Sequence, residues 1–296
     1  MKILIIGGNR FVGKLVTTAL HNSGHNVTIV NRSGTSPVDC TVLCGDRNDT
    51  EQFTSVIGDK QFDCVIDMCL YNMQQARDVV NLFGGKVDKY IYVSSIAVYD
   101  KFDKIPITEA ESANGNNALF GEYGKNKAAI EQYLQQALNF TFPVITVRPT
   151  YILGIDNHIY REKYYFDCCY QLLPIEVNGD GKAPISFVFS SDVCEIICNL
   201  ATTLVPDRAV YNIANDTPVS VVDLIKLIAH ITKQYCLIAV NSNSPQAMQF
   251  QNEPTIISNY HIRNTFPKFK FKTLQQGLTE IHEHYYKVPK GEAVLL

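Results

Sequence analysis

The chain has 296 residues, of which 46% are hydrophobic and 19% are charged, so it can bury a large core and is not of the disordered class. Its formal net charge is -3 and it has no long basic block, which speaks against broad attraction to nucleic acid or to a membrane surface. It has no run of roughly 18 apolar residues that would span a membrane. We therefore expect a cytoplasmic protein with no membrane partner.

The nine cysteines show no metal-binding spacing, and several lie in apolar runs. We interpret them as reduced core residues. His282 and His284 are two residues apart in a predicted helix, so they face apart, and we expect no metal site.

The first thirteen residues read as a buried strand, a glycine turn and the start of a helix. This order is typical of a dinucleotide pyrophosphate site, because the amides at a helix N-terminus attract phosphate. An ordinary strand-to-helix turn is the alternative, and Arg10 stands where the usual pattern has a glycine. The predicted cofactor residues of this turn are Gly7, Asn9, Arg10, Phe11, Val12 and Gly13.

Apolar runs then alternate with helical patterns through the first half of the chain. Strands are predicted at 26–30, 41–44, 64–68, 90–93 and 144–147, and Asn72 is a predicted helix N-cap. This alternation predicts an α/β fold of the Rossmann type, a doubly wound parallel sheet with helices on both faces. A ligand should lie outside the carboxyl ends of the strands.

The second and third strands end in residues that bear on cofactor choice. NAD-binding sites usually place an acid after the second strand, to accept from the ribose 2′-hydroxyl, whereas this chain has the neutral Asn31. Arg10 and Arg32 could meet a 2′-phosphate, so we expect NADP, with NAD as the alternative. Both arginines could instead be solvated. Asp46 could accept from the adenine amino group or be an ordinary turn aspartate.

The fifth strand leads into Ser94 and Ser95, and Tyr123 follows 28 residues after Ser95. Tyr123 and Lys127 are four residues apart and share one helical face. Acid–base work at neutral pH requires a tyrosine pKa about three units below its usual value near 10, which corresponds to roughly 4 kcal/mol. The Lys127 ammonium and a nicotinamide cation together could supply that. Among 16 tyrosines the spacing alone is weak, and the serines and the glycine turn strengthen it.

These pieces, in this order, resemble an extended or atypical short-chain dehydrogenase/reductase of the NAD-dependent epimerase/dehydratase family. Further matches are 45–47, 92–99, 147–151, 191–193 and 211–214. The resemblance implies a catalytic triad of Ser95, Tyr123 and Lys127. It also implies that Lys127 holds the nicotinamide ribose. The other residues it assigns to the cofactor are Arg47, Cys69, Leu70, Ser94 and Pro149.

The resemblance implies an NAD(P)-dependent epimerase or ketoreductase acting on a sugar or nucleotide-sugar hydroxyl or ketone. A dehydratase of the family would carry an Asp-Glu pair after the catalytic serine, where this chain has Ile96 and Ala97. The glycine-turn arginine resembles an atypical branch that includes plant stem-loop RNA-binding proteins. A cofactor-binding regulatory or RNA-binding protein is therefore the alternative.

The second half should build a substrate lobe. We expect a dinucleotide-binding domain at 1–150, to which 186–215 return, and a substrate-binding lobe at 151–185 and 216–296. Nucleotide-sugar enzymes of the family usually place an arginine where this chain has Ile185, and Arg161, Lys163 and Lys182 are the candidate replacements. By the same resemblance we expect a homodimer formed through the helices after the fourth and fifth strands, with apolar contacts from 127–138.

Overall fold

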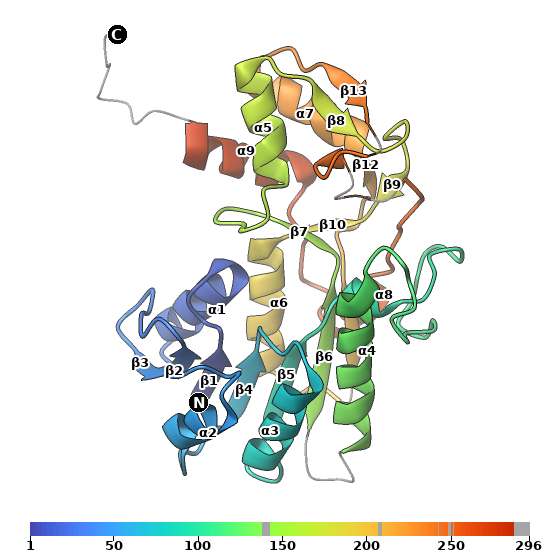
Figure 1. Ribbon diagram of the computed structural model, residues 1–296. Coiled ribbons are helices and arrows are strands. Elements are labelled where there is room, and N and C mark those ends of the chain that lie inside the picture. Colours follow the sequence, from blue (N-terminus) through green and yellow to red (C-terminus); the bar gives the residue numbers. More distant parts are fainter. Residues whose placement is uncertain (138–142, 207–208, 242, 248–249, 251, 287–296) are drawn as a thin grey trace, which may run out of the picture.

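The computed structural model describes residues 1–137, 143–206, 209–241, 243–247, 250 and 252–286. Its centre is a seven-stranded sheet made of β1 (Lys2–Ile6), β2 (Asn26–Asn31), β3 (Thr41–Cys44), β4 (Cys64–Asp67), β5 (Lys89–Val93), β6 (Val144–Pro149) and β11 (Val210–Ile213). The strand order is β11-β6-β5-β4-β1-β2-β3, and every neighbouring pair is parallel (Figure 1). All carboxyl ends therefore meet at one edge of the sheet.

Helices cover both faces of this sheet (Figure 1). Alternate residues of β1 point to opposite faces, so that Ile3 and Ile5 join one hydrophobic cluster while Leu4 and Ile6 join another. The first cluster is completed by α1 (Phe11–Asn22) and α6 (Ser190–Thr202). The second is completed by α2 (Thr50–Ile57), α3 (Met73–Phe83) and α4 (Gly121–Gln136). The doubly wound Rossmann-type fold predicted from the sequence is thereby confirmed.

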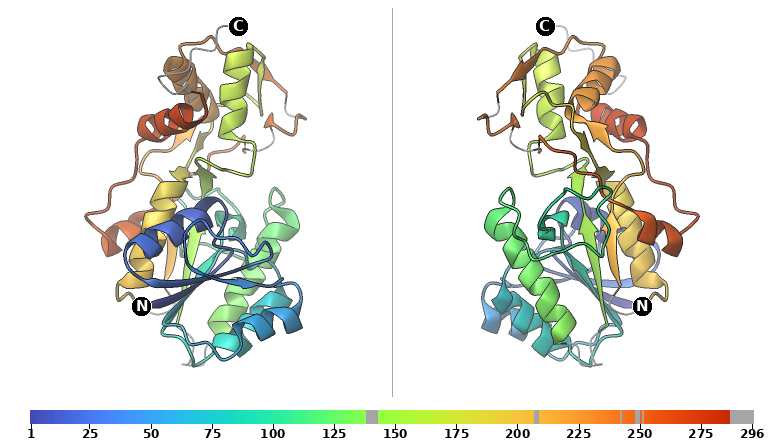
Figure 2. Two further views of the ribbon diagram at one scale, coloured as in Figure 1. Left: turned by 90° about the vertical axis from the view of Figure 1, so that its left-hand side faces the viewer. Right: turned by 90° about the vertical axis from the view of Figure 1, so that its right-hand side faces the viewer.

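A smaller lobe lies beyond the carboxyl ends of the central strands (Figures 1 and 2). Its helices are α5 (Glu162–Gln171), α7 (Val221–Thr232) and α9 (Leu274–Tyr286), and α8 (Tyr260–Thr265) packs beside β11. β7 (Tyr151–Leu153) pairs with β10 (Phe187–Phe189) between the sheet and the lobe (Figure 1). Two further short pairs lie within the lobe: β9 (Pro184–Ile185) with β12 (Val219–Ser220), and β8 (Ile175–Val177) with β13 (Ile238–Val240). A third hydrophobic cluster fills the lobe.

Side-chain N-caps begin α3 and α7, and the one predicted at Asn72 is confirmed. The Asn72 side chain accepts a hydrogen bond from the Gln75 amide, and the Ser220 side chain accepts one from the Asp223 amide, as N-caps do. The side chain of Gln75 accepts from the Tyr71 amide instead of the N-cap amide. The six central strands predicted from the sequence, β1 to β6, agree with their predicted ranges within two residues, and β11 was not predicted as a strand.

The prediction that all nine cysteines are reduced is wrong at two positions. Cys169 in α5 and Cys236, which follows α7, form a disulfide. The other seven cysteines are free. The bond joins segments 67 residues apart, and local sequence carries no signal for such a pairing.

Candidate active site

The glycine turn between β1 and α1 is closed so tightly that side chains are excluded from it. Gly7 has a φ of +87°, and its amide donates to the Val30 carbonyl. A Cβ on Gly13 would lie 2.2 Å from the Gly7 carbonyl oxygen. Because α1 begins at Phe11 and Arg10 makes no side-chain cap, the first amides of the helix remain available to an anion.

A polar cluster of exposed and half-buried side chains lies beside this turn. The Asn9 amide donates to the Ser33 hydroxyl at 2.8 Å, and Ser33 donates to the Asn31 side chain at 3.0 Å. The Arg32 side chain, 74% exposed, comes within 3.9 Å of the Asp46 carboxylate. At this distance the pair is weak, so Arg32 can turn to another anion.

Arg47 occupies a different position from these exposed groups. Its guanidinium is buried and donates to Asp67 at 2.6 Å, while the Tyr90 hydroxyl donates to the other oxygen of the same carboxylate at 2.6 Å. Asp67 raises the pKa of Arg47 by opposing charge, although burial acts in the other direction. The Cys69 thiol lies 3.8 Å from the guanidinium, and burial raises its pKa.

Ser95, Tyr123 and Lys127 gather at the carboxyl end of β5. Lys127 is 2% exposed, and its ammonium donates to the carbonyls of Leu70 at 3.0 Å and Val93 at 2.9 Å. The ammonium lies 5.9 Å from the centre of the Tyr123 ring. Burial lowers the pKa of Lys127 to about 8.

The pKa of Tyr123 departs from the expectation. Burial raises the pKa of its hydroxyl, and a hydrogen bond with the Ser95 side chain acts in the opposite direction. The Lys127 ammonium donates two of its hydrogen bonds to backbone carbonyls and lies over the ring of Tyr123. It therefore lowers the pKa of the Tyr123 hydroxyl less than the sequence spacing predicts. Tyr123 as a whole residue keeps 46% of its surface exposed, although its hydroxyl is in a buried environment.

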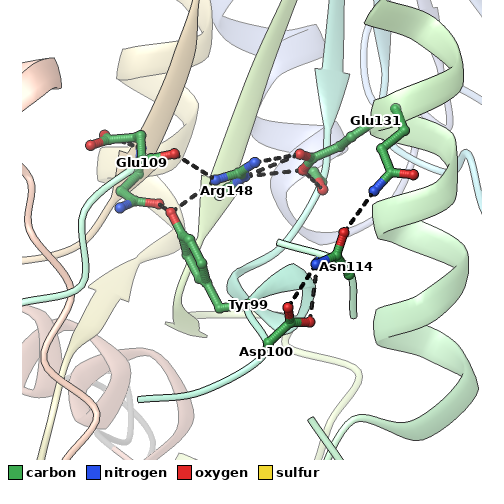
Figure 3. A network of polar contacts seen from close by, with 9 residues as sticks. Tyr99, Asp100, Glu109, Asn114, Glu131 and Arg148 are labelled. Atoms are coloured by element: carbon green, nitrogen blue, oxygen red, sulfur yellow. Dashed lines mark hydrogen bonds and ion pairs between the residues drawn. The ribbon is translucent and has the colours of Figure 1, made fainter. Parts of the chain in front are cut away.

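A buried polar network continues from this point into the protein (Figure 3). The Ser94 hydroxyl donates to Glu131 in α4, and Arg148 in β6 donates to the same carboxylate at 2.6 Å. Arg148 also donates to the Tyr99 hydroxyl at 3.0 Å, which in turn donates to the Asn212 side chain at 2.7 Å. The network joins α4, β6 and β11 with the segment that follows β5, so it fixes the helix that carries Tyr123 against the residue before Ser95.

Comparison with known proteins decides the family. Residues 3–214 match the family described as the NAD dependent epimerase/dehydratase family. The chain belongs to this family. The resemblance found in the sequence motifs is thereby confirmed.

Relatives within and around the family differ in what their names say they do. The chain is 29% identical over 248 residues to the chloroplast stem-loop binding protein of 41 kDa b of Arabidopsis thaliana, which covers 77% of this chain and 62% of that protein. It is 26% identical over 218 residues to 2′-dehydrokanamycin reductase of Streptomyces kanamyceticus, covering 71% and 59%. The chain thus spans about three fifths of the length of these curated relatives.

Solved structures give the same fold. A UDP-glucose 4-epimerase of Thermotoga maritima, solved with UDP-glucose, superimposes with a TM-score of 0.79 at 18% identity, over 96% of this chain and 98% of that one. No helix in the described ranges is both long and apolar enough to cross a membrane.

The predicted site residues of this family member fall into three groups. Gly7 and Gly13 form the turn, and a Cβ on Gly7 would touch the Cys69 sulfur at 3.0 Å. The polar cluster beside the turn contains Asn9 and Asn31, with the Arg32–Asp46 pair next to it. The Leu70 carbonyl accepts a hydrogen bond from Lys127. The backbone of Pro149 pairs with Ile213 beside the network, and Arg47 is buried in its ion pair. The tight glycine turn with free helix amides fits a dinucleotide pyrophosphate.

Sequence reasoning missed the charged residues that connect these groups. Asp67 lies within an apolar strand, and Glu131 follows Lys127 by four residues, one turn along α4. A charged side chain in a buried segment needs a partner, so each was a detectable signal. The identity of the partner was not detectable, because it depends on the order of the strands.

Proposed function

We propose that the protein is an NAD(P)-dependent epimerase or ketoreductase acting on a carbohydrate-like hydroxyl or ketone through Ser95, Tyr123 and Lys127. The observation that carries this proposal is the position of these side chains. The Lys127 ammonium lies 5.9 Å from the Tyr123 ring, and Ser95 bonds with Tyr123, all beside the carboxyl ends of the sheet. Reductase and epimerase names among the relatives support the same chemistry.

A bound nicotinamide would supply hydride transfer with the substrate carbon and, in its oxidised form, a positive charge. Tyr123 removes the hydroxyl proton during oxidation and returns one to the oxygen during reduction. Ser95 donates a hydrogen bond to the same substrate oxygen. Lys127, held by the Leu70 and Val93 carbonyls, orients the ribose with its remaining donor. The Glu131–Arg148 pair keeps these groups in register.

The cofactor and substrate regions follow from the same proposal. Asn31 offers no carboxylate to a ribose 2′-hydroxyl, and Arg32 is exposed beside it, so we propose NADP as the preferred cofactor and NAD as the alternative. Segments 1–150 and 186–215 would bind the cofactor. Segments 151–185 and 216–296 would bind the substrate.

Replacing Tyr123 with phenylalanine tests the catalytic assignment. It removes the transferable proton and keeps the ring, so turnover of a sugar or nucleotide-sugar substrate should fall by about 10²–10⁴-fold while cofactor affinity is retained. Absorbance of the reduced nicotinamide across a carbohydrate panel measures the first quantity, and calorimetry the second. Near wild-type turnover in the variant would show that Tyr123 is not the acid–base residue.

A nucleic-acid function is the second candidate, because one relative is named a stem-loop binding protein. Retention of structured RNA at physiological salt, combined with no cofactor turnover on the carbohydrate panel, would favour it. The formal net charge of -3 favours the enzyme.

We also propose a homodimer formed through α3 and α4. Its contacts depend on which side chains α4 exposes. Ala128, Ile130 and Leu134 pack inside the chain, and apart from Tyr123 the exposed positions of the helix are polar. Leu138 lies outside the described residues. A monomer mass that does not change with concentration would reject the dimer.

A further inference from the structure

The Lys127 ammonium lies among three aromatic rings. It is 4.8 Å from the centre of the Tyr71 ring, 4.9 Å from that of Tyr92 and 5.9 Å from that of Tyr123. Two backbone carbonyls accept hydrogen bonds from the same ammonium. With these groups around it, Lys127 is 2% exposed.

This burial bears on the ribose contact that we propose for Lys127. A ribose hydroxyl must come within about 3 Å of the ammonium nitrogen to accept a hydrogen bond from it. A side chain that is 2% exposed offers almost no surface for that approach. At least one of the three rings must therefore move before a ribose can bind there.

Two of the rings are held in place. Tyr92 is part of β5 and is 0% exposed, so the packing of the sheet fixes its ring. Tyr123 forms a hydrogen bond with the Ser95 side chain, and its ring is the most distant of the three from the ammonium. Moving Tyr123 would also separate the proposed catalytic groups. Tyr71 is the remaining ring.

The Tyr71 side chain can turn without a movement of the backbone. It is 49% exposed, so water can replace its contacts. The residues on either side are fixed, because Leu70 is 0% exposed and Asn72 is the N-cap of α3. The Tyr71 amide also donates to the Gln75 side chain at 2.8 Å. Rotation about the side-chain bonds, which is fast for exposed residues, is therefore the movement that uncovers Lys127.

We propose that Tyr71 is a gating residue, whose ring covers the Lys127 ammonium and turns aside when the nicotinamide ribose binds. The inference rests on the proposed function, because it takes Lys127 as the ribose contact. The face of an aromatic ring attracts an ammonium, so the closed position is favoured. A ligand that binds only the open position has its affinity reduced in proportion to the fraction of open molecules. The gate thus weakens cofactor binding through the nicotinamide half alone.

Calorimetry on the full chain tests the gate without measuring turnover. Tyr71→Ala removes the ring, so the dissociation constants of NADP and NAD should fall about fivefold, which corresponds to about 1 kcal/mol. Tyr71→Phe keeps the aromatic face and should change them less than twofold. Adenosine 2′,5′-bisphosphate and ADP, which lack the nicotinamide ribose, should bind equally to wild type and to Tyr71→Ala.

A double-mutant cycle shows whether the gate acts through the ammonium. Lys127→Met leaves no charge for the ring to cover and no donor for the ribose. Adding Tyr71→Ala to Lys127→Met should therefore change the dissociation constant of the cofactor less than twofold. A fivefold gain in this background as well would overturn the proposal, because the ring would then act on another contact.

Other outcomes also decide. Unchanged or weaker cofactor binding in Tyr71→Ala overturns the gate, and so does an equal gain for the two probes that lack the nicotinamide ribose. Should Tyr71→Ala fail to fold by circular dichroism, Tyr71→Leu, which has no ring face, decides by the same measurements. No cofactor bound by wild type or by any variant overturns the gate and the proposed function together. Normal turnover in Tyr123→Phe overturns the catalytic assignment alone.

Discussion

The two ends of the candidate site hold their polar groups in opposite ways. At the carboxyl ends of β5 and β6, Ser94, Glu131 and Arg148 are all at most 4% exposed and bond to one another. Beside β1 and β2, Asn9 and Arg32 lie at the surface, where water can replace any one contact. The buried end suits chemistry that needs fixed geometry, and the exposed end suits selection among similar ligands. One substitution should therefore cost much at the first and little at the second.

The largest effect is expected at the buried ion pair. Glu131→Gln leaves the Arg148 guanidinium without its carboxylate, so the free energy of unfolding should fall by about 3–5 kcal/mol. Urea unfolding followed by circular dichroism measures this. The matched control is Glu122→Gln on the same helix, whose carboxylate lies 2.9 Å from Lys125 and is 79% exposed, and it should change stability by less than about 1 kcal/mol. An equal loss of unfolding free energy in Glu131→Gln and Glu122→Gln would show that the buried ion pair is no more important to stability than the exposed one.

The next effect is a pH dependence that belongs to Lys127. Its pKa is lowered from 10.5 to about 8 by burial, so between these values the unfolded chain binds more protons than the folded one. The free energy of unfolding must therefore rise with pH across this window. Below pH 8 the cost of burying the charged Lys127 ammonium is fully present. The difference in unfolding free energy between wild type and Lys127→Met should shift in favour of wild type by about 3 kcal/mol from pH 8 to 10.5. A difference that stays constant across this range would contradict the assigned pKa.

The smallest effect is expected at the exposed end. A charge-assisted hydrogen bond contributes about 1.5–3 kcal/mol, so Arg32→Ala should reduce the preference for NADP over NAD by about tenfold. Calorimetry with both cofactors measures the ratio, and Arg77→Ala, at another exposed arginine, is the control. Tighter binding of NAD than NADP by the wild type, or an unchanged ratio in Arg32→Ala, would refute a role for Arg32 in cofactor choice.

The sheet could be predicted because strands buried on both faces are continuous apolar runs, and 64–68 and 144–147 read that way without other information. The buried ion pairs could not be predicted from the sequence. Arg47 and Asp67 are 20 residues apart and Glu131 and Arg148 are 17 apart, and only the strand order brings them together. The Cys169–Cys236 bond was missed for the same reason.

The part that Lys127 plays in setting the pKa of Tyr123 is smaller than the sequence spacing predicts, for a different physical reason. Four-residue spacing correctly placed Lys127 on the face of α4 that carries Tyr123. The spacing could not show that the Lys127 ammonium donates to two backbone carbonyls. Spacing defines which side chains are near each other, and competition from the backbone decides what they bond to.

The sheet is also completed late in synthesis. β6 ends at Pro149, but its outer neighbour β11 begins only at Val210, after the chain has passed through α5, β8 and α6. Until then a nascent chain presents an unpaired strand edge. Before residues 190–202 are made, the face formed by Ile3 and Ile5 also lacks the cover of α6. A ribosome-bound chain stopped before residue 210 should therefore recruit chaperones that recognise exposed apolar strands, and one that extends past α8 should release them.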